Sequence, residues 1–141
     1  MGFFKDLKNK VTGGGATVRV TVPSTRRGQA VPVQVQAVAK TNGKVSAVYL
    51  LLRATENAQF KDSNNDKVSG SKVSYETRVQ IANAQDIKEG ETYNWEGVLE
   101  LPTNSNPTLR GSIIDHTWEI QAGLDMPGND PDSGWQAFEV S

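Results

Sequence analysis

Two groups of acidic and amide side chains are the residues of this sequence best suited to bind a metal ion. The first contains Asp62, Asn64 and Asp66, which have the alternate spacing that opens an EF-hand calcium loop. Lys67 stands where that loop requires glycine, and Val73 stands where it requires a bidentate glutamate. Because Asp and Asn also stabilise turns by bonding to nearby backbone groups, a turn is the simpler interpretation.

The second acidic group contains Asp125, Asp130 and Asp132, which share one polar stretch. Carboxylate oxygens are ligands that calcium prefers, and three of them in one loop can gather around an ion. Turn formation explains these residues equally well. We therefore expect no cofactor and no metal, and calcium binding in either acidic stretch is kept as an alternative.

Enzymatic chemistry has few candidate residues. His116 is the only histidine, so any histidine-dependent nucleophile or metal site would have to use it. It lies between Ile114 and Trp118 on one face of an alternating segment, which is the position of a core histidine bonded to a neighbouring group. No serine lies in a Gly-x-Ser-x-Gly elbow, and no glycine-rich stretch matches a P-loop. The sequence therefore predicts a protein that is not an enzyme.

The three tryptophans suggest carbohydrate binding as an alternative function, because exposed indole rings can line a sugar-binding face. Trp95 and Trp118 fall on the inward faces of alternating segments, where packing into the core is the simpler use of an indole. Trp135 follows a glycine in a turn-rich stretch, and the sequence assigns it to neither role. A carbohydrate- or calcium-binding module therefore remains the alternative to a protein-binding domain.

Composition and charge restrict the partners and the compartment. The 141 residues include no cysteine, so neither a disulfide framework nor a thiolate metal site can form. Fifteen basic residues nearly balance sixteen acidic ones, and a net charge of −1 argues against nucleic-acid binding. The opening sequence MGFFKDLKNK lacks the apolar region of a secretory signal, and no apolar run is long enough to span a membrane. We expect a cytoplasmic protein.

Period-two alternation of apolar and polar residues is the main structural signal of the chain. It recurs in seven segments: 16–22, 31–39, 45–56, 73–81, 93–101, 114–124 and 135–140. Asn42-Gly43 has the composition of a tight hairpin turn, and the polar stretch 58–71 indicates a long loop or a hairpin tip. The pattern predicts an all-β, two-sheet antiparallel sandwich over 16–141, immunoglobulin-like in architecture. It follows an amphipathic segment and glycine linker over 1–15, which contains at most one short helix.

Two apolar clusters lie where an isolated sandwich would expose them. Tyr49 and Leu51 occupy the face of their segment that should be polar, and the N-terminal cluster consists of Phe3, Phe4 and Leu7. Exposed apolar surfaces mark interaction sites, so we expect these five residues to cover one another or to dock a protein partner, a second copy of the chain included. Weak contact with a membrane surface, with Lys5, Lys8 and Lys10 facing anionic lipid, is the alternative.

The run LELPTNSNPTLRGSIIDHTWEIQAGLDMPGNDP, together with MGFFKDLKNKVTGGGA and VYLLLRATE, resembles the bacterial sporulation-control protein M family, which has an arrestin-like fold. This resemblance implies an arrestin N-domain-type sandwich in a cytosolic regulatory protein that binds other proteins and has no known catalytic activity. Members of that family usually carry two tandem sandwiches, and this chain corresponds to the first. The resemblance identifies no partner and no binding residue.

Overall fold

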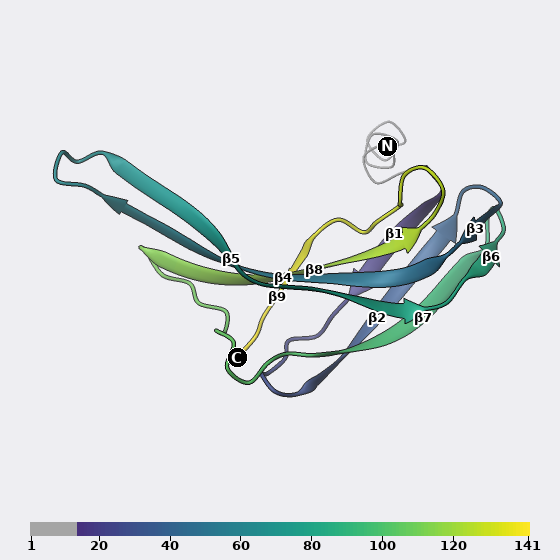
Figure 1. Cartoon of the computed structure of the whole chain (residues 1–141), viewed down its shortest axis with the longest axis horizontal. Coiled ribbons are helices and arrows are strands. Elements are labelled where there is room, and N and C mark those ends of the chain that lie inside the picture. The colour runs from purple at the N-terminus through teal and green to yellow at the C-terminus, as the bar shows by residue number, and fades with distance from the viewer. Residues whose placement is uncertain (1–13) are drawn as a thin grey trace.

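The computed structural model describes residues 14–141, which form nine strands and no helix (Figure 1). The strands are β1 (Ala16–Thr21), β2 (Ala30–Ala39), β3 (Gly43–Val45), β4 (Ala47–Lys61), β5 (Lys67–Ala82), β6 (Gln85–Ile87), β7 (Thr92–Glu100), β8 (Ile114–Asp125) and β9 (Gln136–Phe138). The predicted N-terminal helix and the cluster of Phe3, Phe4 and Leu7 lie outside the described residues.

The strands form two main antiparallel sheets and one small ribbon. The first sheet has the order β1-β2-β7, the second has the order β5-β4-β8-β9, and β3 pairs with β6. The two main sheets face each other, and their inward residues form one hydrophobic core. The predicted all-β, two-sheet antiparallel sandwich is confirmed.

Strand β2 shows how the alternation builds the core. Its odd-numbered residues from Val31 to Ala39 are buried, and its even-numbered residues are exposed. Pro32 is accommodated although β2 is the central strand of its sheet, because the pairing with β1 begins only at Gln34. The proline therefore lies where β2 has a neighbour, β7, on one side only. A residue without an amide hydrogen is tolerated at such a position.

Two local predictions were wrong. Asn42-Gly43 does not close a hairpin, because β3 pairs with β6 instead of folding back on β2. The Asn42 side chain accepts a hydrogen bond from the Glu89 backbone N–H at 2.9 Å, which fixes the start of this ribbon. The segment 85–87, which lies outside the seven alternating segments predicted to be strands, forms the second strand of the ribbon. These short pairings depend on residues distant in sequence and leave no periodic signal.

Strands β4 and β5 are longer than the alternation predicted and project beyond the sandwich (Figure 1). The register changes from Ala54↔Tyr75 to Thr55↔Val73, so Ser74 is an extra residue that forms a β-bulge in β5. We call the hairpin beyond this bulge, residues 55–73, the arm. Of the two structures proposed for the polar stretch 58–71, the hairpin is correct, and its tip is confined to residues 62–66.

Candidate functional site

The junction between the arm and the sandwich is organised by His116, which is buried as the alternation predicted. Its Nδ1 lies 3.0 Å from the Pro107 carbonyl oxygen, and its Nε2 lies 2.6 Å from the Ser74 Oγ. A carbonyl only accepts, so Nδ1 donates to Pro107, and in the neutral imidazole Nε2 accepts from the Ser74 hydroxyl, whose oxygen also lies 3.3 Å from the Ala54 carbonyl oxygen. The imidazole thus ties the bulge in β5, at the base of the arm, to the loop before β8.

A hydroxyl that donates to a histidine nitrogen is also the arrangement of a nucleophile and its base. In hydrolytic triads a carboxylate orients the histidine and stabilises the imidazolium that forms. Here the group on Nδ1 is the neutral carbonyl of Pro107, which supplies no negative charge. The arrangement of Ser74 and His116 therefore fits a positioning role in the fold better than a catalytic one.

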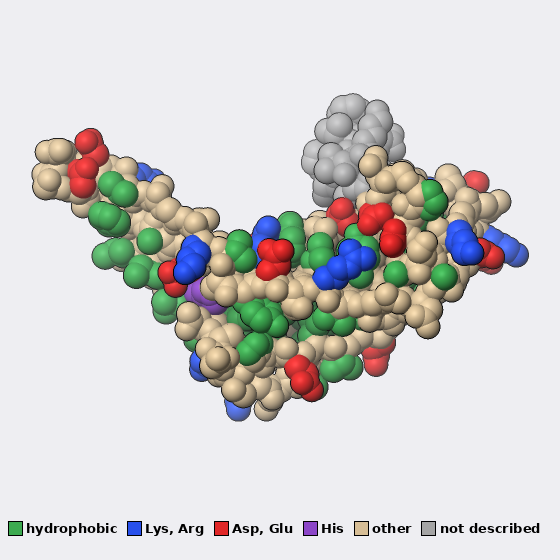
Figure 2. Space-filling model, viewed as in Figure 1, with side chains coloured by type: hydrophobic (Ala, Val, Ile, Leu, Met, Phe, Trp, Pro, Cys, Tyr) green, Lys and Arg blue, Asp and Glu red, His purple; other side chains and the backbone are tan. Residues whose placement is uncertain are grey.

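The arm carries an exposed apolar row on one face. Phe60 and Val68 are cross-strand partners, and Ala58 lies opposite Ile114 of β8. Residues directly opposite each other in a sheet point to the same side, so these side chains share a face with Ala54 and continue the core row of β4 outward. Phe60 is 51% exposed, and Val68 and Ile114 are exposed as well. Figure 2 shows hydrophobic side chains gathered along one side of the arm.

We refer to Phe60, Val68, Ile113 and Ile114 as the arm face; all four are large hydrophobic residues that remain exposed. A core sheet would bury such a row against the opposite sheet, but the arm extends past the end of that sheet (Figure 1). Contiguous exposed apolar side chains on a soluble domain mark an interaction surface. The sequence analysis missed this site, because the alternation of the arm is interrupted by serine, glycine and lysine.

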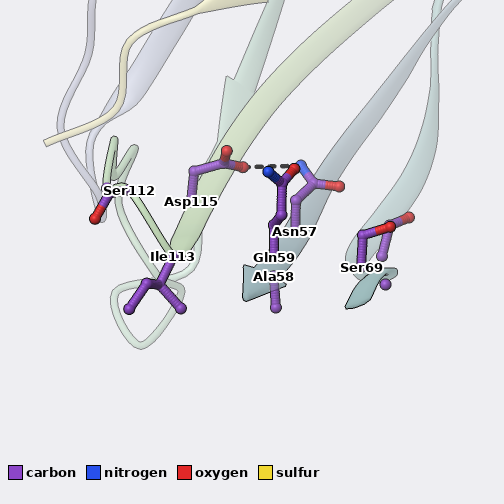
Figure 3. A pocket seen from close by; sticks show the side chains of 10 residues that line it. Asn57, Ala58, Gln59, Ser69, Ser112, Ile113 and Asp115 are labelled. Atoms are coloured by element: carbon purple, nitrogen blue, oxygen red, sulfur yellow. Dashed lines mark hydrogen bonds between the residues drawn. The ribbon is translucent and has the colours of Figure 1, made fainter. Parts of the chain in front are cut away.

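A groove of about 570 Å³ lies between the arm and the segment that precedes β8 (Figure 3). Asn57 donates from Nδ2 to Asp115 Oδ1 at 2.8 Å across its wall, and the Gln59 N–H donates to the Ile113 carbonyl at 2.7 Å. Gly70 adds no side chain on the other wall, where a Cβ atom would have no neighbour within 4 Å. The groove is therefore lined by amides, hydroxyls and one carboxylate, whose side chains alternate with those of Phe60 and Val68 and lie on the other side of the strand pair.

The structure places the predicted docking residue Tyr49 under other parts of the same chain. Tyr49 is 5% exposed, its hydroxyl donates to Asp130 Oδ2 at 2.9 Å, and the Arg78 guanidinium lies 3.9 Å above its ring. Gly123 makes this position possible, because a Cβ atom there would come within 2.4 Å of the phenol. Burial, followed by the bond to Asp130, raises the pKa of Tyr49 to about 12. Leu51 is half-buried on the same face.

The first acidic group forms the tip of the arm. Asp62 Oδ1 accepts hydrogen bonds from the backbone N–H groups of Asn64 and Asp66, both at 2.9 Å. Asn65 adopts a left-handed conformation with φ of 66°, which asparagine tolerates better than most residues. The acidic side chains of this stretch thus stabilise the turn that joins β4 to β5.

The second acidic group is also engaged by its own loop. Asp130 accepts from Tyr49 and from the Met126 N–H, and Asp132 accepts from the Gly134 N–H at 2.8 Å. Within residues 14–141, no group of three or more His, Cys, Asp or Glu side chains is arranged to hold a metal ion. Turn formation accounts for the bonds of Asp130 to Met126 and of Asp132 to Gly134, and the bond from Tyr49 ties the loop to β4.

We expect millimolar calcium to leave the melting temperature unchanged, because the carboxylates of Asp62, Asp130 and Asp132 already accept bonds from their own loops. An occupied site would stabilise the fold by about 2.7 kcal/mol at a hundredfold excess over its dissociation constant. Thermal denaturation with calcium and then with a chelator measures the difference, and Asp62→Asn/Asp66→Asn is the matched variant. A rise that the chelator reverses would contradict the expectation and favour the calcium-binding alternative.

Comparison with solved structures gives a match over nearly the whole chain. The crystal structure of Spo0M, a sporulation control protein from Bacillus subtilis, superposes with a TM-score of 0.63 at 16% sequence identity, covering 92% of this chain and 50% of Spo0M. The chain therefore has the fold of that protein, an arrestin-like β-sandwich, and spans about half of its length. No protein-family profile and no curated protein matches the sequence. The described residues include no helix long and apolar enough to cross a membrane.

Proposed function

We propose that this chain is a non-catalytic protein-binding domain with a regulatory, adaptor-type role in the cytoplasm, and that the arm face is its docking surface. The observation that carries the proposal is the row of exposed apolar side chains on a hairpin that no other part of residues 14–141 covers. Such a row costs free energy in water, and a partner that covers it removes that cost. The identity of the partner is not implied by the row.

The alternative of a carbohydrate-binding face has less support. A carbohydrate-binding face needs a solvent-exposed aromatic ring on which a sugar can stack, and Trp118 is fully buried. Trp95 is half-buried and donates from Nε1 to Gln85, and one face of the exposed Trp135 ring is occupied by the Arg53 guanidinium at 3.9 Å. The arm face instead combines aliphatic side chains with one exposed phenylalanine, which is a composition that suits a polypeptide partner.

The similarity of fold supports a regulatory role, since Spo0M is described as a sporulation control protein. The chain covers half of Spo0M, so a role like that of the whole protein is part of the proposal. The hydrogen bonds of His116 support a non-catalytic role, because they anchor the arm to the sandwich. Binding through the arm would then depend on the arm being held at a fixed angle.

Site-specific photo-crosslinking tests the proposal. A benzophenone amino acid in place of Phe60 is expected to give a defined crosslinked product in cells, because the side chain lies at the centre of the arm face. The matched control is the same substitution at Val98, which is 56% exposed on β7 in the other sheet. At position 98 we expect the amount of crosslinked product to stay at background level.

The crosslinked protein is then identified by mass spectrometry, purified and titrated with the parent domain and with Phe60→Ser/Val68→Ser. Loss of two buried apolar side chains should weaken binding by at least about tenfold. The melting temperature should stay unchanged, since both residues lie outside the core. Equal crosslinking at positions 60 and 98, or equal affinity of parent and variant, would refute the arm as the docking surface.

A further inference from the structure

Strand β5 forms an open edge of the larger sheet. It pairs with β4 and has no strand neighbour on its other side within the described residues. The register with β4 changes at Ser74 and again near Ile81, so the run from Tyr75 to Gln80 is a regular strand between two irregularities. A regular open edge presents unpaired backbone N–H and C=O groups to any strand that approaches it.

The residues of this run are self-complementary about Thr77. We infer that two copies of the chain pair antiparallel along β5, with the twofold axis at Thr77. In that register Glu76 of each copy lies opposite the partner's Arg78, and Tyr75 of each copy lies opposite the partner's Val79. Thr77, on the axis, lies opposite the partner's Thr77. Opposite charges, an aromatic beside a β-branched residue, and paired threonines are the cross-strand combinations that stabilise antiparallel sheets.

The faces of the sheet agree with this register. Glu76 and Arg78 lie opposite Arg53 and Leu51 of β4 and are exposed on the outer face. Tyr75 and Val79 lie opposite Ala54 and Leu50 and are half-buried against the core. Each charged pair would therefore form in solvent, and each apolar pair would extend the core side of the sheet. Arg78 is held above the Tyr49 ring, so ordering its side chain costs little further entropy.

The other two long edge strands lack this complementarity. Arg19 is the only charged residue of β1, so a twofold pairing there gains no opposite charge. Strand β7 carries Glu96 and Glu100 without a basic residue, and a twofold pairing centred near either one brings like charges together. Among the edges of the described sandwich longer than three residues, β5 alone places acid and base at i and i+2 around a central residue.

A single cysteine at the proposed axis tests the register. The chain contains no cysteine, so Thr77→Cys is uniquely reactive. Residues directly opposite in an antiparallel pair have Cα atoms about 4.5 to 5.5 Å apart, which is within the range of roughly 4.4 to 6.8 Å that a disulfide spans. In one glutathione redox buffer, Thr77→Cys should form a covalent dimer at least about tenfold faster than Thr21→Cys, the exposed threonine of edge strand β1.

A charge exchange tests the same register without a covalent bond. Glu76→Arg places two arginines opposite each other in both symmetry-related pairs. The dimerisation constant measured by sedimentation equilibrium should then weaken about tenfold. Glu76→Arg/Arg78→Glu restores both pairs with their signs exchanged and should recover the parental constant to within about twofold. Far-UV circular dichroism and thermal melts confirm that each variant is folded.

Crosslinking of Thr77→Cys no faster than that of Thr21→Cys would overturn the inference. A parent that stays monomeric at the highest soluble concentration would do the same, as would a double variant that fails to recover. None of these results bears on the arm face, which lies beyond the bulge at Ser74, so the dimer and the docking surface can fail independently.

Discussion

Replacement of Trp118 by alanine is expected to lower the free energy of unfolding by about 3 to 5 kcal/mol, the cost of deleting a large aromatic from a packed core. Trp118 is fully buried, and its ring lies 5.8 Å from that of Tyr75 and 6.3 Å from that of Phe138. Its Nε1 also donates to the Asn106 carbonyl at 2.9 Å. The substitution therefore removes packing between three strands and a tether of the loop before β8.

Urea denaturation followed by far-UV circular dichroism measures this effect. Trp135→Ala is the control, because its ring is 37% exposed and contacts Arg53 from outside the sheet. The control should shift the midpoint only slightly, as surface substitutions usually do. A Trp118→Ala midpoint equal to that of the parent would show that the indole is not part of the core.

The second large effect concerns pH. The pKa of Tyr49 is raised to about 12, chiefly by burial and then by its bond to Asp130. In the unfolded chain a tyrosine titrates near pH 10, so the folded state holds the proton more tightly. The stability that this contributes is fully present below pH 10 and is lost as the pH rises through 12. For a shift of two units it amounts to about 2 to 3 kcal/mol.

Urea unfolding of the parent and of Tyr49→Phe at a series of pH values tests the linkage. The parent should lose stability between pH 10 and pH 12, and the phenylalanine variant should lose less over the same interval, because it has no proton to release at this position. Tyr93, whose pKa is also raised, chiefly by desolvation, titrates in both proteins and so cancels in the comparison. Parallel curves for the two proteins would rule out a coupling of the Tyr49 proton to folding.

The sandwich was predictable because most of its strands alternate cleanly. In β2 every second residue from Val31 is apolar and buried, and in β8 the same holds from Trp118 to Leu124. The arm was not predictable as a surface, because Phe60 and Val68 are separated from the core rows by serine, glycine and charged residues. Only the pairing of β4 with β5 places these two side chains opposite each other, and the register of that pairing has no signature in either strand alone.

The environment of Tyr49 was hidden from the sequence for a different reason. The sequence predicts that the face of β4 that carries Tyr49 is too apolar to remain exposed to solvent. In the structure the Tyr49 ring is buried. The cover comes from Arg78 and from the loop that holds Asp130, and the space for it comes from Gly123. A missing Cβ atom across a strand pair cannot be recognised without the register, so the position of the ring could not be derived from alternation.

The arm also constrains how insertions and deletions can alter the chain. Its tip, residues 62–66, is exposed, and exposed tips of this kind tolerate changes in length. Side chains alternate between faces with a period of two, so adding or removing one residue per strand between the bulge and Phe60 would turn Phe60 and Val68 to the opposite face. Changes of two residues per strand in that segment preserve the face and move these side chains by about 6.6 Å along the arm. Related chains can therefore shift this surface along the arm only in such steps, while the sandwich below stays the same.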